Sequence, residues 1–155
     1  MTIAVGDEAP DFAVPGTDGT RDGERCYSLR EYRGQAVVLV FYPADHSPVC
    51  TAQLNAYSHD IGQFADLGAQ VLALSPQSVA EHVGFAAANG GFAFPLLADV
   101  DKVVAAAYGT LGPLGFYRRS IIVVGADGVV GYAHRATAGL TFRPTEEIVA
   151  ALAGL

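Results

Sequence analysis

The chemistry of this chain centres on Cys50, one of two cysteines among 155 residues. It follows the polar segment Asp45-His46-Ser47-Pro48-Val49, and an apolar run ending at Pro43 precedes that segment. Ser47 is a candidate helix N-cap and Pro48 suits the first helical position, so we expect Cys50 in the first turn of a helix. The helix dipole and the unpaired N–H groups there favour a thiolate, which is the reactive form of cysteine.

The elements that would position Cys50 alternate along the chain. Residues 35–42 are continuously apolar and rich in β-branched side chains, which predicts a central strand covered on both faces and ended by Pro43. Residues 48–67 repeat apolar side chains at helical spacing, and a second buried strand is expected at 69–75. A helix at 78–89 begins with a capping box of Ser78 and Glu81.

The flanking segments complete the predicted architecture. A short strand at 11–14 precedes the turn signals Pro15-Gly16, and further elements follow at 26–28, 29–32, 94–98 and 100–108. Strands at 120–124 and 129–133 flank a hairpin signal at 126–128, and a helix at 144–152 closes the chain. This order predicts one α/β domain over residues 1–155, with a mixed central β-sheet flanked by α-helices.

Composition excludes several classes of function. The chain is 51% hydrophobic and 16% charged with a net charge of −7, so we expect an ordered domain without nucleic acid or membrane partners. It has no basic residue ahead of the short N-terminal apolar patch and no run of 18 apolar residues, so we expect a cytoplasmic location. The four histidines show no metal-ligand spacing, and neither a metal nor another cofactor is expected.

The segment around Cys50 resembles the active-site motif of peroxiredoxins, which are thiol peroxidases with a thioredoxin-like fold. Pro43-x-x-x-Ser47-x-x-Cys50 matches Pro-x-x-x-Thr/Ser-x-x-Cys, and the longer string is similar to that of the PrxQ (bacterioferritin comigratory protein) branch. Further landmarks follow in the family's order: Ala9-Pro10-Asp11-Phe12, Leu29-Arg30-Glu31-Tyr32-Arg33-Gly34, Phe94-Pro95-Leu96-Leu97-Ala98-Asp99 and Arg118-Arg119-Ser120.

This resemblance implies a thiol-dependent peroxidase that reduces hydrogen peroxide and organic hydroperoxides through a sulfenic acid at Cys50. It also implies that Arg119 contacts thiolate and peroxide, that the Ser47 hydroxyl binds peroxide, and that Pro43 shields the pocket. Such groups are needed because a lower thiol pKa alone does little for the rate. It raises the fraction of thiolate by roughly 14-fold, but it lowers the nucleophilicity of that thiolate by roughly tenfold. Positioning and charge stabilisation must supply the rest of the rate.

Two departures from the PrxQ pattern concern the mechanism. Gln53 stands where the branch often has Glu, and Asn55 stands where many members carry a resolving cysteine. Cys26 is the other thiol and could resolve the sulfenic acid within the chain or across a dimer. We favour a one-cysteine mechanism in which an external thiol is the reductant, either thioredoxin, glutaredoxin or a low-molecular-weight thiol. The enzyme is expected to be a monomer or a homodimer.

Other interpretations of these residues stay open. The fold could serve as a redox sensor or binding protein that Cys50 oxidation switches, whereas a thioredoxin-like reductase is disfavoured because the chain lacks Cys-x-x-Cys. Ser47 could act only as a helix cap. Asp45 and His46 are interpreted as loop residues, and His82 is interpreted as a residue on a helix face.

Overall fold

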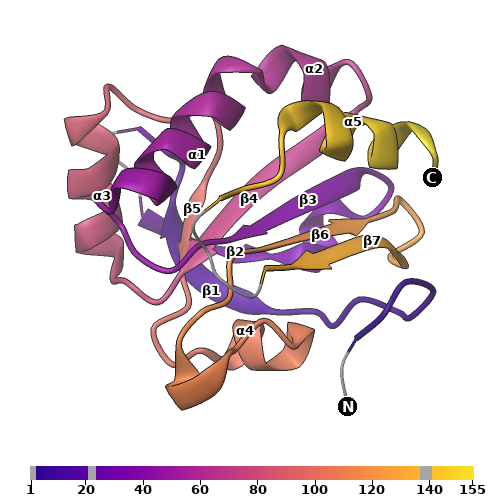
Figure 1. The fold of residues 1–155 in the computed structure, drawn as a ribbon, viewed down its shortest axis with the longest axis horizontal. Helices are drawn as coiled ribbons and strands as arrows, with labels where there is room; N and C mark the ends of the chain where they lie inside the picture. The colour runs from indigo at the N-terminus through magenta and orange to yellow at the C-terminus, as the bar shows by residue number, and fades with distance from the viewer. Residues whose placement is uncertain (1–2, 21–23, 137–140) are drawn as a thin grey trace.

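A mixed seven-stranded sheet forms the centre of the protein, as Figure 1 shows for a computed structural model that describes residues 3–20, 24–136 and 141–155. The strand order is β2-β1-β5-β4-β3-β6-β7. The strand bounds are β1 Ala13–Thr17, β2 Glu24–Ser28, β3 Ala36–Phe41, β4 Ala69–Ser75, β5 Leu96–Ala98, β6 Ser120–Val124 and β7 Val130–Arg135. Parallel pairing joins β3 to β4 and β4 to β5, and the other neighbours pair antiparallel.

Helices cover both faces of the sheet (Figure 1). The helices are α1 Pro48–His59, α2 Ile61–Ala65, α3 Val79–Ala88, α4 Val103–Tyr108 and α5 Thr145–Ala153, and two 3-10 turns span Leu29–Tyr32 and Pro113–Gly115. Side chains from α1, α2, α3 and α5 pack on one face with Val38 and Val40 of β3. Side chains of α4 pack on the other face with Val37 and Leu39.

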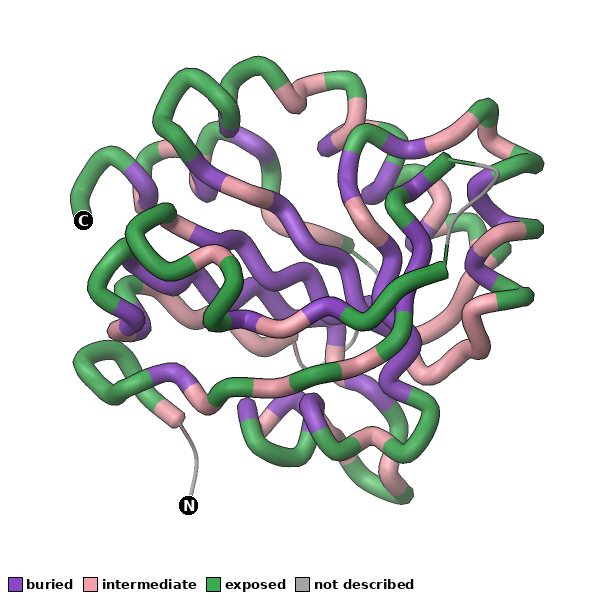
Figure 2. Tube along the Cα trace, turned by 180° about the vertical axis from the view of Figure 1, so that it is seen from behind, coloured by how far each residue is buried: buried purple, intermediate pink, exposed green. Residues whose placement is uncertain are grey.

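The central strand is buried on both faces, as its continuous apolar sequence predicts. Every residue of β3 after Ala36 is buried, and Figure 2 shows buried backbone through the middle strands. The loop from Pro43 to Ser47 therefore begins at the end of a rigid, buried strand. The predicted hairpin between β6 and β7 is also present, with Gly128 at a φ of 83°.

Two segments differ from the sequence prediction at the N-terminal side of the sheet and in the first long helix. Pro15 and Gly16 lie inside β1 rather than in a turn. A Cβ on Gly16 would lie 2.7 Å from the Leu96 carbonyl oxygen, so only glycine allows this close approach of β5.

The helix predicted over 48–67 is two helices that meet at Asp60. The Asp60 carboxylate there accepts a hydrogen bond of 2.7 Å from the Thr145 hydroxyl at the start of α5.

The helix predicted over 100–108 begins later, at Val103, and Val100 is 55% exposed. The reason is a capping interaction from outside the helix. The buried Asp99 carboxylate accepts the backbone N–H groups of Val104 and Ala105 at 3.1 and 3.0 Å. These are donors of the first turn that would otherwise be unpaired. Among the described segments, no helix is both long and apolar enough to cross a bilayer.

Candidate active site

Cys50 lies in the first turn of α1, and its residue is fully buried. Pro48 is the first helical residue, where the N–H that it lacks would have no helical partner. The backbone N–H of Cys50 donates to the Ser47 hydroxyl at 3.4 Å, so Ser47 is the N-cap of α1. Accepting this bond leaves the Ser47 hydroxyl proton available for a second partner, so capping and peroxide binding are compatible roles.

Arg119 brings a charge to Cys50 from a distant part of the chain. β6 runs antiparallel to β3 with Ser120 opposite Phe41, so the residue before β6 lies at the end of β3 from which the Cys50 loop departs. Arg119 is 5% exposed as a residue, and its Nη2 donates to Cys50 Sγ at 3.2 Å. The neighbouring Arg118 instead donates to the carbonyl oxygens of Ala136 and Arg135 at 3.1 and 3.0 Å.

Gln53, one turn along α1 from Cys50, orients the same guanidinium. Its Oε1 accepts from Arg119 Nη1 at 2.5 Å, and its Nε2 donates to the Tyr57 hydroxyl at 3.4 Å. The Tyr57 hydroxyl in turn donates to the Arg143 carbonyl oxygen at 2.6 Å. Burial raises the pKa of Tyr57 to about 12, so the phenol keeps its proton at neutral pH. Sequence reasoning noted Gln53 only as a departure from a motif.

The segment between β3 and α1 has a second set of buried partners. The Asp45 carboxylate accepts the Tyr42 hydroxyl at 2.7 Å through Oδ1, and its Oδ2 lies 2.7 Å from Nδ1 of His82 on α3. Burial raises the pKa of Tyr42 well above its ordinary value, and the Asp45 charge adds to this effect. Sequence reasoning assigned Asp45 to a loop and His82 to a helix face. The pairing has no sequence signal, because 37 residues separate the two.

The predicted site residues therefore occupy one end of β3. Cys50, Ser47 and Arg119 are linked by hydrogen bonds, and Pro43 begins the half-buried loop that joins β3 to Ser47. A cavity of about 20 Å³ lies beside Arg119 and Gln53. This arrangement brings a thiol, a buried guanidinium and a hydroxyl to one place. In the described ranges, no group of three or more metal-binding side chains is found.

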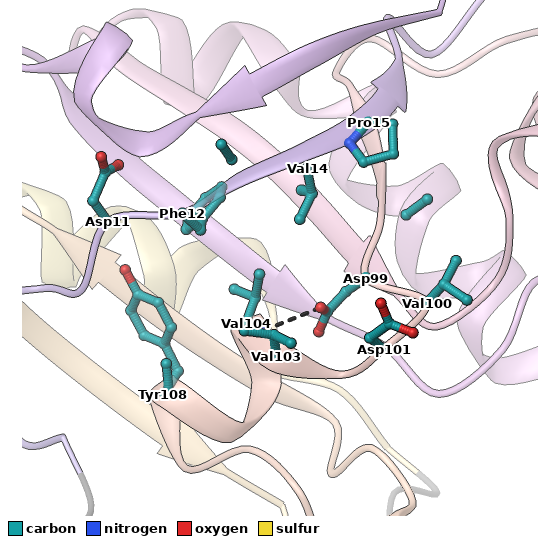
Figure 3. Close-up of a pocket in the computed structure, with 13 residues that line it drawn as sticks. Asp11, Phe12, Val14, Pro15, Asp99, Val100, Asp101, Val103, Val104 and Tyr108 are labelled. Atoms are coloured by element: carbon teal, nitrogen blue, oxygen red, sulfur yellow. Dashed lines mark hydrogen bonds between the residues drawn. The ribbon is translucent and has the colours of Figure 1, made fainter.

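A larger pocket of about 400 Å³ lies away from this site, between β1 and α4 (Figure 3). Phe12 and Val14 line one side and Val103 and Val104 line the other. Val14 and Val104 belong to the core on the face of the sheet opposite Cys50. The Asp99 carboxylate in this pocket already accepts the two N–H groups that begin α4 as well as the Tyr117 hydroxyl. The pocket is therefore separate from the chemistry at Cys50.

Cys26 is exposed on β2, at the edge of the sheet. Four strand spacings separate β2 from β3 in the strand order. At about 4.8 Å per spacing this is roughly 19 Å, whereas a disulfide needs Cα atoms within about 7 Å. A bond between Cys26 and Cys50 of one chain would require a large rearrangement of the sheet.

Comparisons with known proteins agree with the fold and with the resemblance to a known family. The family model described as the AhpC/TSA family matches residues 5–133. A Mycobacterium tuberculosis protein named as a putative peroxiredoxin is 36% identical over 135 residues, which cover 83% of this chain and 82% of the relative. A peroxiredoxin of Thermoplasma volcanium is 30% identical, and the match covers 100% of this chain and 76% of the relative.

Solved structures lead to the same fold. The crystal structure of Enterococcus faecalis AhpC superposes with a TM-score of 0.90 at 25% identity, covering 99% of this chain and 92% of the other. The predicted thioredoxin-like α/β fold is therefore confirmed, and the named relatives are consistent with a PrxQ-like protein. The chain belongs to the AhpC/TSA family, the peroxiredoxins, and is a thiol-dependent peroxidase.

Proposed function

We propose that the protein reduces hydrogen peroxide and organic hydroperoxides by a one-cysteine mechanism in which Cys50 is the reacting thiolate. The observation that carries the proposal is the 3.2 Å contact between Arg119 Nη2 and Cys50 Sγ at the start of α1. A guanidinium offers several fixed donors, so it can bond the sulfur and the incoming peroxide together. Ser47 supplies a further hydroxyl and Pro43 shields the pocket without adding a donor.

The reaction is a two-electron transfer at sulfur. The Cys50 thiolate attacks one peroxide oxygen, the O–O bond breaks, and the second oxygen leaves as hydroxide or alkoxide and takes a proton. Cys50 becomes a sulfenic acid. An external thiol then attacks the sulfenic sulfur and expels water, and a second thiol releases Cys50 and leaves the reductant as a disulfide. Thioredoxin, glutaredoxin or a low-molecular-weight thiol fits this role for a monomeric or homodimeric enzyme.

The position of Cys26 supports an external reductant. It lies four strand spacings from β3, and Asn55 is an exposed residue of α1 whose amide donates to Asn89 at 3.0 Å. Cys26 is too far from Cys50 in the same chain, and residue 55 carries an amide in place of a thiol.

The test is intact-mass measurement after one equivalent of peroxide, on the wild type and on Cys50→Ser and Cys26→Ser. We expect the wild type and Cys26→Ser to gain one oxygen and to turn over with an added thiol. Cys50→Ser should show neither effect. Peroxide consumption by Cys50→Ser would refute the assignment of the reacting thiol. A loss of two hydrogens, or a covalent dimer that Cys26→Ser abolishes, would refute the one-cysteine mechanism. Oxidation no faster than that of a free thiol would favour a sensor.

A further inference from the structure

The loop from Pro43 to Ser47 is tied to α3 by a buried polar contact. Asp45 and His82 meet through Oδ2 and Nδ1 at 2.7 Å, and their side chains are 2% and 0% exposed. The Tyr42 hydroxyl donates to the other Asp45 oxygen and also lies 3.5 Å from His82 Nδ1. The end of β3, the loop and α3 thus share one buried cluster.

Each polar atom of this cluster has a defined partner. His82 Nε2 lies 2.9 Å from the Leu97 carbonyl oxygen, which can only accept, so Nε2 carries a proton. Nδ1 then shares one proton with the Asp45 carboxyl group. The backbone N–H of Asp45 donates to Gln77 Oε1 at 3.0 Å, and this oxygen also accepts the Ser75 hydroxyl at 2.9 Å. Bonds to Leu97 of β5 and to Gln77, two residues after β4, therefore fix both partners in place.

A strained residue and a ring contact hold the same loop. His46 has a φ of 65°, a left-handed conformation that costs a non-glycine residue energy unless its surroundings enforce it. Its ring packs edge-on against Phe85 at a centroid separation of 5.0 Å. Phe85 lies one turn after His82 on α3. One face of α3 therefore holds two consecutive loop residues.

We propose that Asp45 and His82 are positioning residues of the peroxidase site, and that their contact sets where Ser47 and Cys50 lie relative to Arg119. The inference rests on the proposed role of Cys50. The loop has only Ser47 between His46 and α1, so a shift of Asp45 moves the N-cap and the first turn together. The backbone of Arg119 directly precedes β6, which pairs with β3, so it would not follow the loop. A misplacement of about 1 Å at a reacting centre costs on the order of 100-fold in rate.

The experiment uses the full chain with Cys26→Ser, so that Cys50 is the only thiol, and adds His82→Asn, His82→Gln or Asp45→Leu. An asparagine amide can occupy the position of Nδ1 and keep the bond to Asp45. A glutamine amide can occupy the position of Nε2, which keeps the bond to Leu97 and loses the one to Asp45. Stopped-flow rates of Cys50 oxidation by hydrogen peroxide are compared with rates of alkylation by iodoacetamide, which does not need a positioned peroxide. Near-ultraviolet circular dichroism checks the fold well below the thermal midpoint.

We expect His82→Gln and Asp45→Leu to lower the oxidation rate by tenfold to 100-fold without lowering the alkylation rate, and His82→Asn to stay within about threefold of the parent. Equal effects of the two His82 variants, or unchanged oxidation in His82→Gln, would overturn the proposal. If His82→Gln does not fold, Asp45→Leu, which is similar in shape to the wild type but cannot hydrogen-bond His82, carries the same comparison, and unchanged oxidation there would overturn the proposal equally. A parent that forms no sulfenic acid would refute the role of Cys50 instead, which distinguishes the two failures.

Discussion

Replacing Arg119 by methionine tests the contact on which the site depends. The change removes the charge and the 3.2 Å hydrogen bond to Cys50 Sγ while nearly keeping the length of the side chain. A hydrogen bond to a charged partner contributes about 1.5–3 kcal/mol, and the site is buried, so solvent would not compensate the loss. If this energy acts on the transition state, oxidation of Cys50 slows by roughly 10- to 150-fold.

The assay is the second-order rate of Cys50 oxidation by hydrogen peroxide, followed by stopped flow in the Cys26→Ser background. Arg118→Met is the matched control, because Arg118 precedes Arg119 and bonds to the carbonyl oxygens of Ala136 and Arg135. We expect the control to stay within about threefold of its parent. A folded Arg119→Met variant that oxidises as fast as the control would refute the role of the guanidinium.

Three further predictions concern neighbouring groups. Gln53→Glu places a carboxylate where the amide oxygen now lies 2.5 Å from Arg119, so it competes for the guanidinium, and we expect the oxidation rate at neutral pH to fall roughly tenfold. An unchanged rate would contradict this. The folded-state pKa of Tyr57 is raised to about 12 from an ordinary 10, so its contribution to stability is full below pH 10 and is lost as pH rises to 12. In urea unfolding, the free energy of unfolding of the wild type should fall by up to about 2.7 kcal/mol more between pH 10 and 12 than that of Tyr57→Phe. An equal fall in the two proteins would contradict this prediction. Ser78→Ala removes the hydroxyl that accepts the Glu81 N–H at 3.2 Å and should lower the free energy of unfolding by about 1 kcal/mol in the same assay.

Much of the fold was predictable because its signals are local. The apolar run of β3, the N-cap Ser47 and the capping box of Ser78 depend on residues within one element, and the structure has them as predicted. The break at Asp60 and the late start of α4 were not predictable. At both places the structure shows a bond with a residue outside the helix, Thr145 at Asp60 and Asp99 at the first turn of α4.

The site shows the same division. The motif predicted that Pro43, Ser47 and Cys50 lie together, and the family resemblance directed attention to Arg119. The partners that hold these residues were not visible in the sequence, since Asp45 and His82 meet only after β4 and α3 have packed. Neither residue is unusual for its local element, so only the three-dimensional arrangement identifies the pair.

If Cys50 is the reacting thiol, as we propose, its complete burial separates the two halves of the catalytic cycle. A peroxide is small, but a protein thiol cannot reach a buried sulfenic sulfur unless the first turn of α1 opens. Local opening that costs about 2–3 kcal/mol would expose roughly 1% of the molecules at a time. Every contact that tightens the loop then speeds oxidation and slows recycling, and a sulfenic acid that waits longer meets a second peroxide more often. The cluster at Asp45 would therefore set how readily the enzyme is overoxidised to the sulfinic acid.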